Sequence, residues 1–521
     1  MRRPVFLLGL LAVLLASGPG ELYASSPAER LAHEAEVRLA AWQFRRAEAL
    51  LGLAGVAFPA DPAVLRARAR LRYLQGDYRA AQRLLARLPA PVRAADPRVK
   101  VVDAAVAVTH GFVTRRSPSG HFVFRYPPGR EGLLVPYASQ VLDQARAVLA
   151  KEWGLSPDGP VRVEILPGPE ALARLSPLTE DDVRRTGTIA LCRDRKIMAV
   201  TPRALVTGYN WQDTLAHEYV HYVLEVNARG RVPLWLHEGL ARFAQERWRR
   251  PFPDRLTPLQ SHLLAAGLAG PGLVPLSRMV PSFAKLKSSQ EAALAYAQVA
   301  SMVLYLTKRH GPAGVKRVLA GLASGLTLDQ ALRVVIGVDV NGFQARWRRW
   351  LGRQPLRRVA SYDYLGHRYR PAPGKAPQGA VPRRPVARYR RLGAILRSRG
   401  RRRAAVVAYE RAFRASDHSD GQVANTLARL LVRQGQAARA RQVVARALPF
   451  NRELAALYVV GARAAEASKR TAEAERMLWG ANRLDPFDPE IHCRLATLLA
   501  ARKAPQAGHE QQLCRTLKDD P

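Results

Sequence analysis

Cysteine is scarce in this chain of 521 residues, which contains only Cys192, Cys493 and Cys514. Three cysteines are too few for a fold stabilised mainly by disulfide bonds or for a cysteine-rich zinc module. Cys493 and Cys514 could pair in an oxidising compartment, whereas Cys192 lies in an apolar stretch and is expected to be a buried thiol. The length instead favours two to four domains, and apolar residues, at 48% of the chain, suffice for their cores.

Acidic residues are also few, since 42 Asp and Glu face 82 Lys and Arg, for a formal net charge of +40. Such a charge raises the hypothesis of a protein that binds nucleic acid or another polyanion. The arginines, however, are scattered over predicted helix faces and do not gather around a nucleic-acid motif. We therefore interpret the charge as the composition of a GC-rich genome and expect no nucleic-acid partner.

Long apolar runs are absent beyond the N-terminus. Residues 1–24 combine a basic start, an apolar run of about a dozen residues and small residues, which is typical of a secretory signal peptide. The run is shorter than the roughly 20 residues of a membrane-spanning helix. We therefore expect an exported protein, periplasmic or secreted, which meets a membrane only through an uncleaved signal or electrostatic attraction.

Two parts of the chain repeat with a period of 34 or 35 residues. The matched positions are Phe44 with Tyr78, Ala47 with Ala81, Gly400 with Gly435, and Ala412 with Ala447. These stretches resemble tetratricopeptide repeats (TPRs), stacked helix pairs that usually hold a protein partner in a concave groove. We predict TPR-like helical repeats at 28–112 and 387–521. The N-terminal pair has an alternative role, which is to pack on the central domain.

Between the repeats the pattern changes from helical to mixed. Residues 135–153 read as a helix packed on strands, and the chain is strongly helical from Trp211 onward. Residues 353–386 are rich in Pro and Arg and are predicted to be a linker. The short apolar or alternating segments predicted as strands are Gly120–Tyr126, Val161–Leu166, Thr188–Cys192 and Lys196–Val200.

The stretch "DTLAHEYVHYVLEV", residues 213–226, contains the residues predicted to bind a metal ion and to take part in catalysis. His217 and His221 are four residues apart, so on a helix they project from one face and can bind one tetrahedral zinc ion. Glu218 is one step further round the helix, where it can accept a proton from a water molecule at the metal. The spacing therefore predicts a Zn²⁺ site that still needs a third ligand and a position open to water.

Three downstream residues are candidates for the third ligand. Glu225 lies on the same helix about 12 Å from His217 at the usual helical rise, which is too far to share the metal. His237 and Glu238 lie on a second predicted helix that opens at Pro233. Being adjacent, they point about 100° apart, so only one of them can face the zinc.

The segment "TLAHEYVHYVLEVNARGRVPLWLHEGLARFAQE" resembles the gluzincin peptidases, in particular the bacterial peptidase-MA-like group. Those proteins pair a His-Glu-x-x-His helix with a downstream "WL-x-EGLA" helix. The resemblance implies the zinc ligands His217, His221 and Glu238, with Glu218 as general base. It also implies a thermolysin-like zincin catalytic domain at 115–352. His237 departs from the pattern, because relatives often have a smaller polar residue there.

The predicted fold class is α+β and mostly helical, a zincin catalytic domain flanked by α-solenoid, TPR-like segments. The resemblance implies a zinc-dependent peptidase acting on protein or peptide substrates. A second donor must then stabilise the oxyanion, and Tyr296 is a candidate whose alternative is a plain core aromatic. Strands near 187–200 are expected to offer a sheet edge to an extended peptide. The rival hypothesis is a non-catalytic TPR scaffold of the cell envelope.

Overall fold

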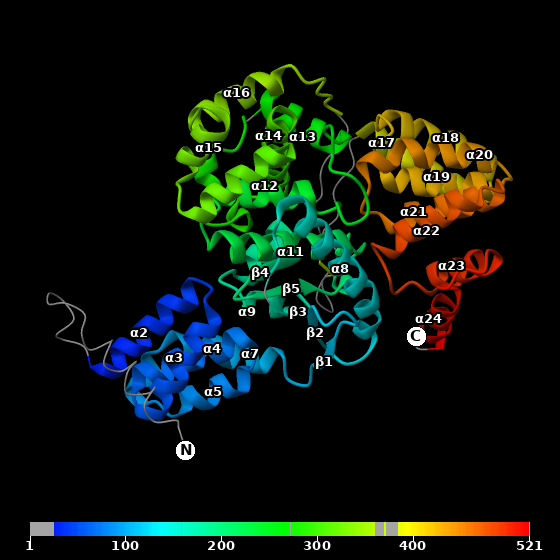
Figure 1. The fold of residues 1–521 in the computed structure, drawn as a ribbon. Coiled ribbons are helices and arrows are strands. Elements are labelled where there is room, and N and C mark those ends of the chain that lie inside the picture. The colour runs from blue at the N-terminus through cyan, green and yellow to red at the C-terminus, as the bar shows by residue number, and fades with distance from the viewer. Residues whose placement is uncertain (1–25, 158, 271, 360–368, 371–383, 520–521) are drawn as a thin grey trace. The chain divides into compact units, whose positions relative to one another are not determined.

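The chain divides after Ala107 into two compact units, each described here by itself (Figure 1). The computed structural model describes residues 26–157, 159–270, 272–359, 369–370 and 384–519. The predicted signal peptide, residues 1–24, lies outside the described residues. No helix among the described residues is long and apolar enough to cross a membrane.

The first unit consists of paired helices that follow the repeat seen in the sequence. Ser26, Asp61 and Asp77 cap three of the helices with their side chains, which satisfies backbone N–H groups that lack partners within the helix. Ala47 and Ala81 are fully buried, so the helices of a pair approach closely at these positions. The helices are α2 (Pro27–Ala40), α3 (Phe44–Ala57), α4 (Pro62–Gln75), α5 (Tyr78–Ala86), α6 (Ala90–Ala95) and α7 (Pro97–Val108).

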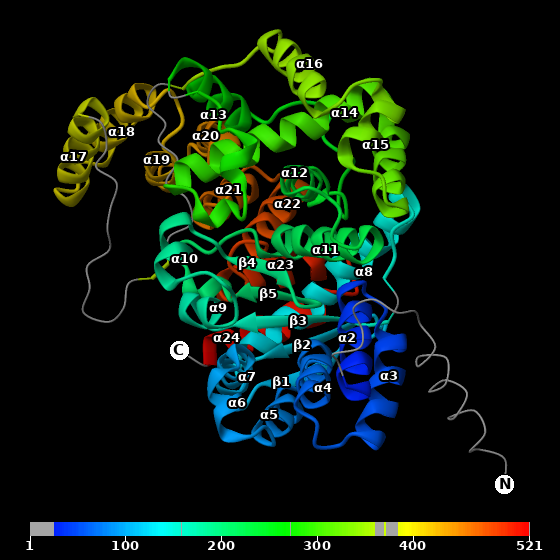
Figure 2. The same ribbon diagram turned by 90° about the vertical axis from the view of Figure 1, so that its left-hand side faces the viewer.

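The second unit contains one five-stranded sheet with the strand order β1-β2-β3-β5-β4 (Figure 2). The three central strands are parallel, and both edge strands are antiparallel to their neighbours. Four strands lie where the sequence predicts them, but β1 was not predicted because all its side chains are exposed. The strands are β1 (Val113–Arg116), β2 (Phe122–Tyr126), β3 (Val161–Leu166), β4 (Ala190–Arg193) and β5 (Lys196–Val200).

Helices α8, α9 and α11 of the same unit pack directly against this sheet. The central one, α11, packs against β4, β5, α8, α12 and α14, and most of its residues are buried. Helix α14 is kinked at Gly311, directly before Pro312, which cannot donate a backbone hydrogen bond. The helices are α8 (Leu134–Trp153), α9 (Pro169–Arg174), α10 (Glu180–Thr186), α11 (Trp211–Ala228), α12 (Leu234–Ala244), α13 (Pro258–Ala269), α14 (Ser289–Ser324), α15 (Leu328–Ile336) and α16 (Val340–Gly352).

The C-terminal part of this unit is again a series of paired helices. Gly400 and Gly435 occupy the turns with positive φ, and Ala412, Ala447 and Ala481 are fully buried between helices. The first helix begins at Arg384, inside the predicted linker 353–386, because the helical pattern starts before the Pro-rich stretch is complete. The helices are α17 (Arg384–Ser398), α18 (Arg402–Ala415), α19 (Gly421–Arg433), α20 (Ala437–Ala447), α21 (Ala455–Ala467), α22 (Thr471–Asn482), α23 (Pro489–Ala501) and α24 (Ala507–Asp519).

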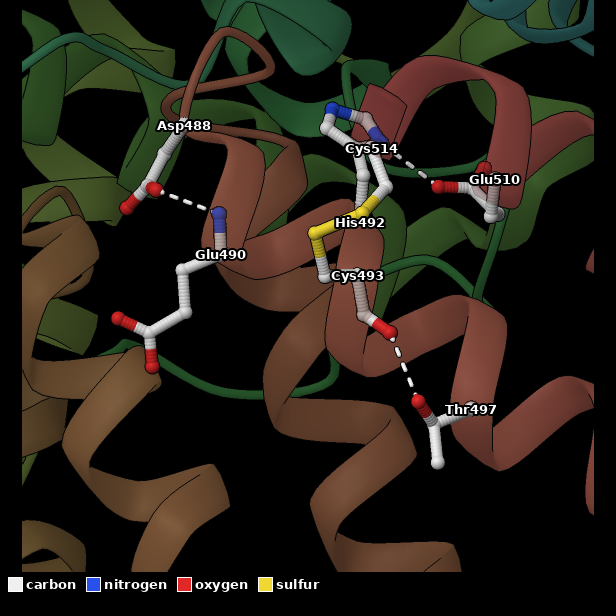
Figure 3. The surroundings of a disulfide bond; sticks show 7 residues. All are labelled: Asp488, Glu490, His492, Cys493, Thr497, Glu510 and Cys514. Atoms are coloured by element: carbon white, nitrogen blue, oxygen red, sulfur yellow. Dashed lines mark hydrogen bonds and ion pairs between the residues drawn. A yellow bond between two sulfur atoms is a disulfide. The ribbon is translucent and has the colours of Figure 1, made fainter. Parts of the chain in front are cut away.

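The last repeat is closed by a disulfide bond between Cys493 of α23 and Cys514 of α24 (Figure 3). The sequence left this pairing open, and the structure contains it. Beside it, the buried His492 ring lies between Glu510 and the Pro486 carbonyl, with its nitrogens 2.7 Å and 2.8 Å from their oxygens. Cys192 is a free thiol on β4.

Side chains of the C-terminal repeats also bond to helices around the sheet. Tyr137 of α8 donates a hydrogen bond to Glu510 at 2.7 Å. Arg452 forms an ion pair with Glu246 at 3.0 Å, just beyond α12. The repeats are therefore anchored close to the helices that carry the predicted site.

Candidate active site

Helix α11 brings the two predicted histidine ligands together. It begins after Asn210, whose side chain accepts a hydrogen bond from the backbone N–H of Asp213. One helical turn separates His217 from His221, and their Nε2 atoms lie 3.1 Å apart. Both side chains are buried. Glu218 is buried beside them, within the same compact group of metal-ligating side chains.

Helix α12 carries Glu238 to this pair. Its Oε2 atom lies 3.4 Å from the Nε2 atom of His217 and 3.4 Å from that of His221. The next residue, Gly239, lets α12 approach α14, because a Cβ atom there would lie only 2.8 Å from the Val299 carbonyl oxygen. The glycine of the "EGLA" motif thus serves the close packing that positions the carboxylate.

His237 faces Glu225, whereas Glu238 faces the histidine pair. Its Nε2 atom lies 3.4 Å from Oε1 of Glu225, and its ring stacks on that of His221 at a centroid distance of 4.5 Å. The residues alone left open which neighbour faces the histidine pair. The structure places Glu238 there and turns the nitrogen of His237 toward Glu225.

Burial and mutual charge shift the acid–base properties of these groups. Burial raises the pKa of Glu218 to about 7 and lowers that of His217 to about 4. Burial opposes ionisation of Glu238 and His221 as well, but their mutual attraction outweighs it. The pKa of Glu238 therefore falls well below its usual range, and that of His221 rises. A carboxyl group that titrates near pH 7 is suited to general acid–base chemistry.

The three facing donor atoms fit a zinc ion. Their separations of 3.1, 3.4 and 3.4 Å are close to the edge of a tetrahedron with zinc–ligand distances near 2.1 Å, about 3.4 Å. The Oε2 atom of Glu238 is buried and has no hydrogen-bond partner among the described residues. Two imidazoles and one carboxylate are also ligands that zinc accepts. The residues therefore fit the metal that the sequence predicts.

A pocket opens onto His217 and Glu218. The segment from Thr186 to Ala190, leading into β4, forms part of its wall. Tyr296 of α14 lines the pocket too, and its ring meets the His217 ring edge-to-face at 6.4 Å. Tyr296 is thus a residue of the pocket wall, although the sequence also allowed a plain core aromatic.

Arg242 also lines this pocket, and sequence reasoning missed it. Its guanidinium carbon lies 4.6 Å from the centroid of the Tyr296 ring. The available signal was its spacing, since Arg242 follows Glu238 by four residues and so projects from the same helix face. Nothing in the sequence showed that α14 would place Tyr296 beneath it.

Comparison with known protein families finds a match in the central part of the chain. Residues 141–353, which include α11 and α12, match the Peptidase MA superfamily. A search of curated proteins finds no match. Residues 141–353 are therefore similar to the peptidase-like domains of this superfamily, and the predicted fold class, mostly helical with TPR-like repeats, is confirmed.

Several solved structures are similar to the chain over long stretches at low identity. Yeast Tom70 is 11% identical with a TM-score of 0.22, covering 96% of this chain and 90% of that chain. The P58(IPK) TPR domain is 12% identical with a TM-score of 0.21, covering 92% and 99%. Yeast LTA4 hydrolase in complex with bestatin is 10% identical with a TM-score of 0.28, covering 78% and 67%. TM-scores this low support no inference about activity.

Proposed function

We propose that this protein is an exported zinc-dependent peptidase, which hydrolyses peptide bonds in protein or peptide substrates. One observation carries the proposal. The donor atoms of His217, His221 and Glu238 face one another within 3.4 Å, with the buried carboxyl group of Glu218 beside them. The match of residues 141–353 to the Peptidase MA superfamily supports the same reading.

Each residue has a distinct role in this proposal. His217, His221 and Glu238 hold the zinc ion, which when bound lowers the pKa of a coordinated water toward 7 and polarises the scissile carbonyl. Glu218 takes the proton of the attacking water and delivers it to the leaving amine. Tyr296 donates a hydrogen bond to the carbonyl oxygen as negative charge develops there.

The edge of the sheet provides a place for the substrate backbone. β4 is an edge strand, and residues 188–190 at its start line the pocket. An extended peptide can add to such an edge through main-chain hydrogen bonds. This arrangement would present the scissile bond to Glu218 through contacts with the main chain of the substrate.

The TPR-like repeats are proposed to recruit a protein partner or substrate to the peptidase domain. The rival proposal is a non-catalytic scaffold of the cell envelope, favoured by the number of helical repeats in the chain. The two proposals differ in the need for Glu218. A scaffold keeps its cellular function after Glu218→Gln, whereas a peptidase loses it.

The direct test is hydrolysis of a mixed peptide library by the zinc-loaded chain, followed by mass spectrometry. We expect zinc-dependent cleavage that a chelator abolishes and added zinc restores. Glu218→Gln should reduce the rate by about 100- to 10,000-fold while keeping bound zinc, because the glutamate is not a ligand. Cleavage at the wild-type rate by Glu218→Gln would overturn the proposed mechanism.

A further inference from the structure

Arg242 of α12 differs from the arginines that follow the end of this helix. The next three ion-paired arginines each have a carboxylate partner within hydrogen-bonding range: Arg247 with Glu152, Arg249 with Asp213, and Arg250 with Glu246. Arg242 has no carboxylate within 4 Å among the described residues, and its one hydrogen bond goes to the neutral amide of Gln245 at 3.1 Å. Arg242 is therefore the cation of this group that has no ion-pair partner in the part of the chain that the structure describes.

This cation faces the proposed active site. Arg242 is half-buried and lines the pocket together with His217, Glu218 and Gln245. Its guanidinium lies over the Tyr296 ring, which in turn contacts the His217 ring. The Tyr296 ring therefore contacts both the positively charged Arg242 and the predicted metal ligand His217.

A half-buried guanidinium is strongly stabilised by charge-assisted hydrogen bonds when an anion binds beside it in the pocket. Its planar set of N–H groups matches the two oxygens of a carboxylate. The pocket contains two carboxyl groups of its own, Glu218 and the exposed Glu453, and neither forms an ion pair with Arg242. The contact with the Tyr296 ring and the hydrogen bond from one guanidinium N–H to Gln245 hold the Arg242 side chain at the pocket wall.

We propose that Arg242 binds a carboxylate of the substrate close to the scissile bond, and so selects anionic substrates. The proposal rests on the proposed peptidase function. Arg242 follows the ligand Glu238 by four residues, a helical rise of about 6 Å, which equals about two extended peptide residues. The carboxylate therefore lies within about two residues of the cleaved bond. It is either the free C-terminus of the peptide or an Asp or Glu side chain.

The first experiment compares matched peptides cleaved by the zinc-loaded full chain. It starts from a peptide whose cleavage site has been mapped. One pair has a free or an amidated C-terminus two residues beyond the cleaved bond. The other pairs have an amidated C-terminus and carry Glu or Gln at each of the two positions on either side of the bond. For each pair, kcat/KM of the peptide with the carboxylate is divided by kcat/KM of its neutral partner. The pair with the largest ratio identifies the source of the carboxylate.

We expect the carboxylate peptide of one pair to be preferred by about 10- to 100-fold, the usual gain from a charge-assisted contact. Arg242→Gln should abolish that preference, mainly through KM, and Arg242→Lys should retain part of it. Arg255→Gln, at an arginine whose side chain is 88% exposed, is the matched control and should leave the preference unchanged. If Arg242→Gln lowers kcat/KM equally for charged and neutral peptides, Arg242 only supports Tyr296 and the proposal is wrong.

The second experiment separates this proposal from the peptidase assignment. Fluorescence anisotropy measures binding of the same labelled peptides to the inert Glu218→Gln chain, with and without Arg242→Gln. Carboxylate-selective binding that Arg242→Gln removes supports the subsite, even if the wild-type chain cleaves nothing. Cleavage without selective binding or a carboxylate preference would overturn the subsite and leave the peptidase intact.

Discussion

Two kinds of helix contact in the same compact unit bury opposite kinds of side chain. The C-terminal repeats bring helices together over alanines, with Ala412 and Ala447 fully buried. Helices α11 and α12 meet over His217, His221 and Glu238, which are buried or nearly so. Burying alanine costs little, whereas burying ionisable groups carries a desolvation penalty.

The difference shows where the chain gives up stability. Buried polar atoms without a hydrogen-bond partner among the described residues include Nδ1 of His217, Nδ1 of His221 and Oε2 of Glu238. Such atoms weaken a fold unless they serve another purpose. Close packing around them, including the contact at Gly239, holds the site in place. The contacts made by Ala412 and Ala447 bury no polar side-chain atom and so need no such support.

Replacing a well-bonded buried carboxylate should have the largest effect on stability. Asp213 of α11 accepts hydrogen bonds from Trp248 and Arg249 at 2.6–3.0 Å. In Asp213→Asn the guanidiniums of Arg249, Arg250 and Arg452 must share the single carboxylate of Glu246. We therefore expect the free energy of unfolding to fall by about 3–5 kcal/mol. Urea denaturation measures this change.

The control is Glu218→Gln on the same helix. Burial already favours the uncharged form of Glu218, so a neutral amide should leave the denaturation midpoint unchanged or raise it slightly. Equal destabilisation by the two variants would contradict the distinction between structural and catalytic carboxylates in α11.

Filling the close contact between α12 and α14 should have a smaller effect. In Gly239→Ala the new methyl group would lie 2.8 Å from the Val299 carbonyl oxygen and 2.8 Å from Cγ2 of Val303. We expect a loss of about 1–3 kcal/mol from overpacking, together with weaker zinc binding as Glu238 is displaced. Gly508→Ala, where nothing lies within 4 Å of the added Cβ, is the matched control in α24 and should keep both properties. Unchanged zinc affinity in Gly239→Ala would show that this packing does not position the ligand.

Local patterns in the sequence predicted the parts of the site that lie within single helices. The spacing of His217 and His221 fixes a shared face of α11, and the resemblance to a known motif pointed to Glu238. The choice between His237 and Glu238 could not be made from spacing, because it depends on how α12 is rotated against α11. That rotation depends in turn on long-range packing, including the contact of Gly239 with α14.

Features that depend on distant segments were missed or left open. The role of Arg242 depends on Tyr296, which lies 54 positions further along the chain and reaches the pocket through the packing of α14. β1 has four exposed residues and so lacks the alternation that marks a strand. The repeats were easier to predict from the sequence, because their period of 34 or 35 residues is visible along the chain and small residues recur at each helix contact.

The most direct test of the central claim is the zinc content of the purified chain, measured by elemental analysis after loading with zinc and dialysis. We predict one zinc ion per chain in the wild type, the same in His237→Ala, and loss of the metal in Glu238→Ala. Circular dichroism on each variant confirms that it is folded. A wild-type chain without zinc, or loss of zinc only in His237→Ala, would contradict the account of this site.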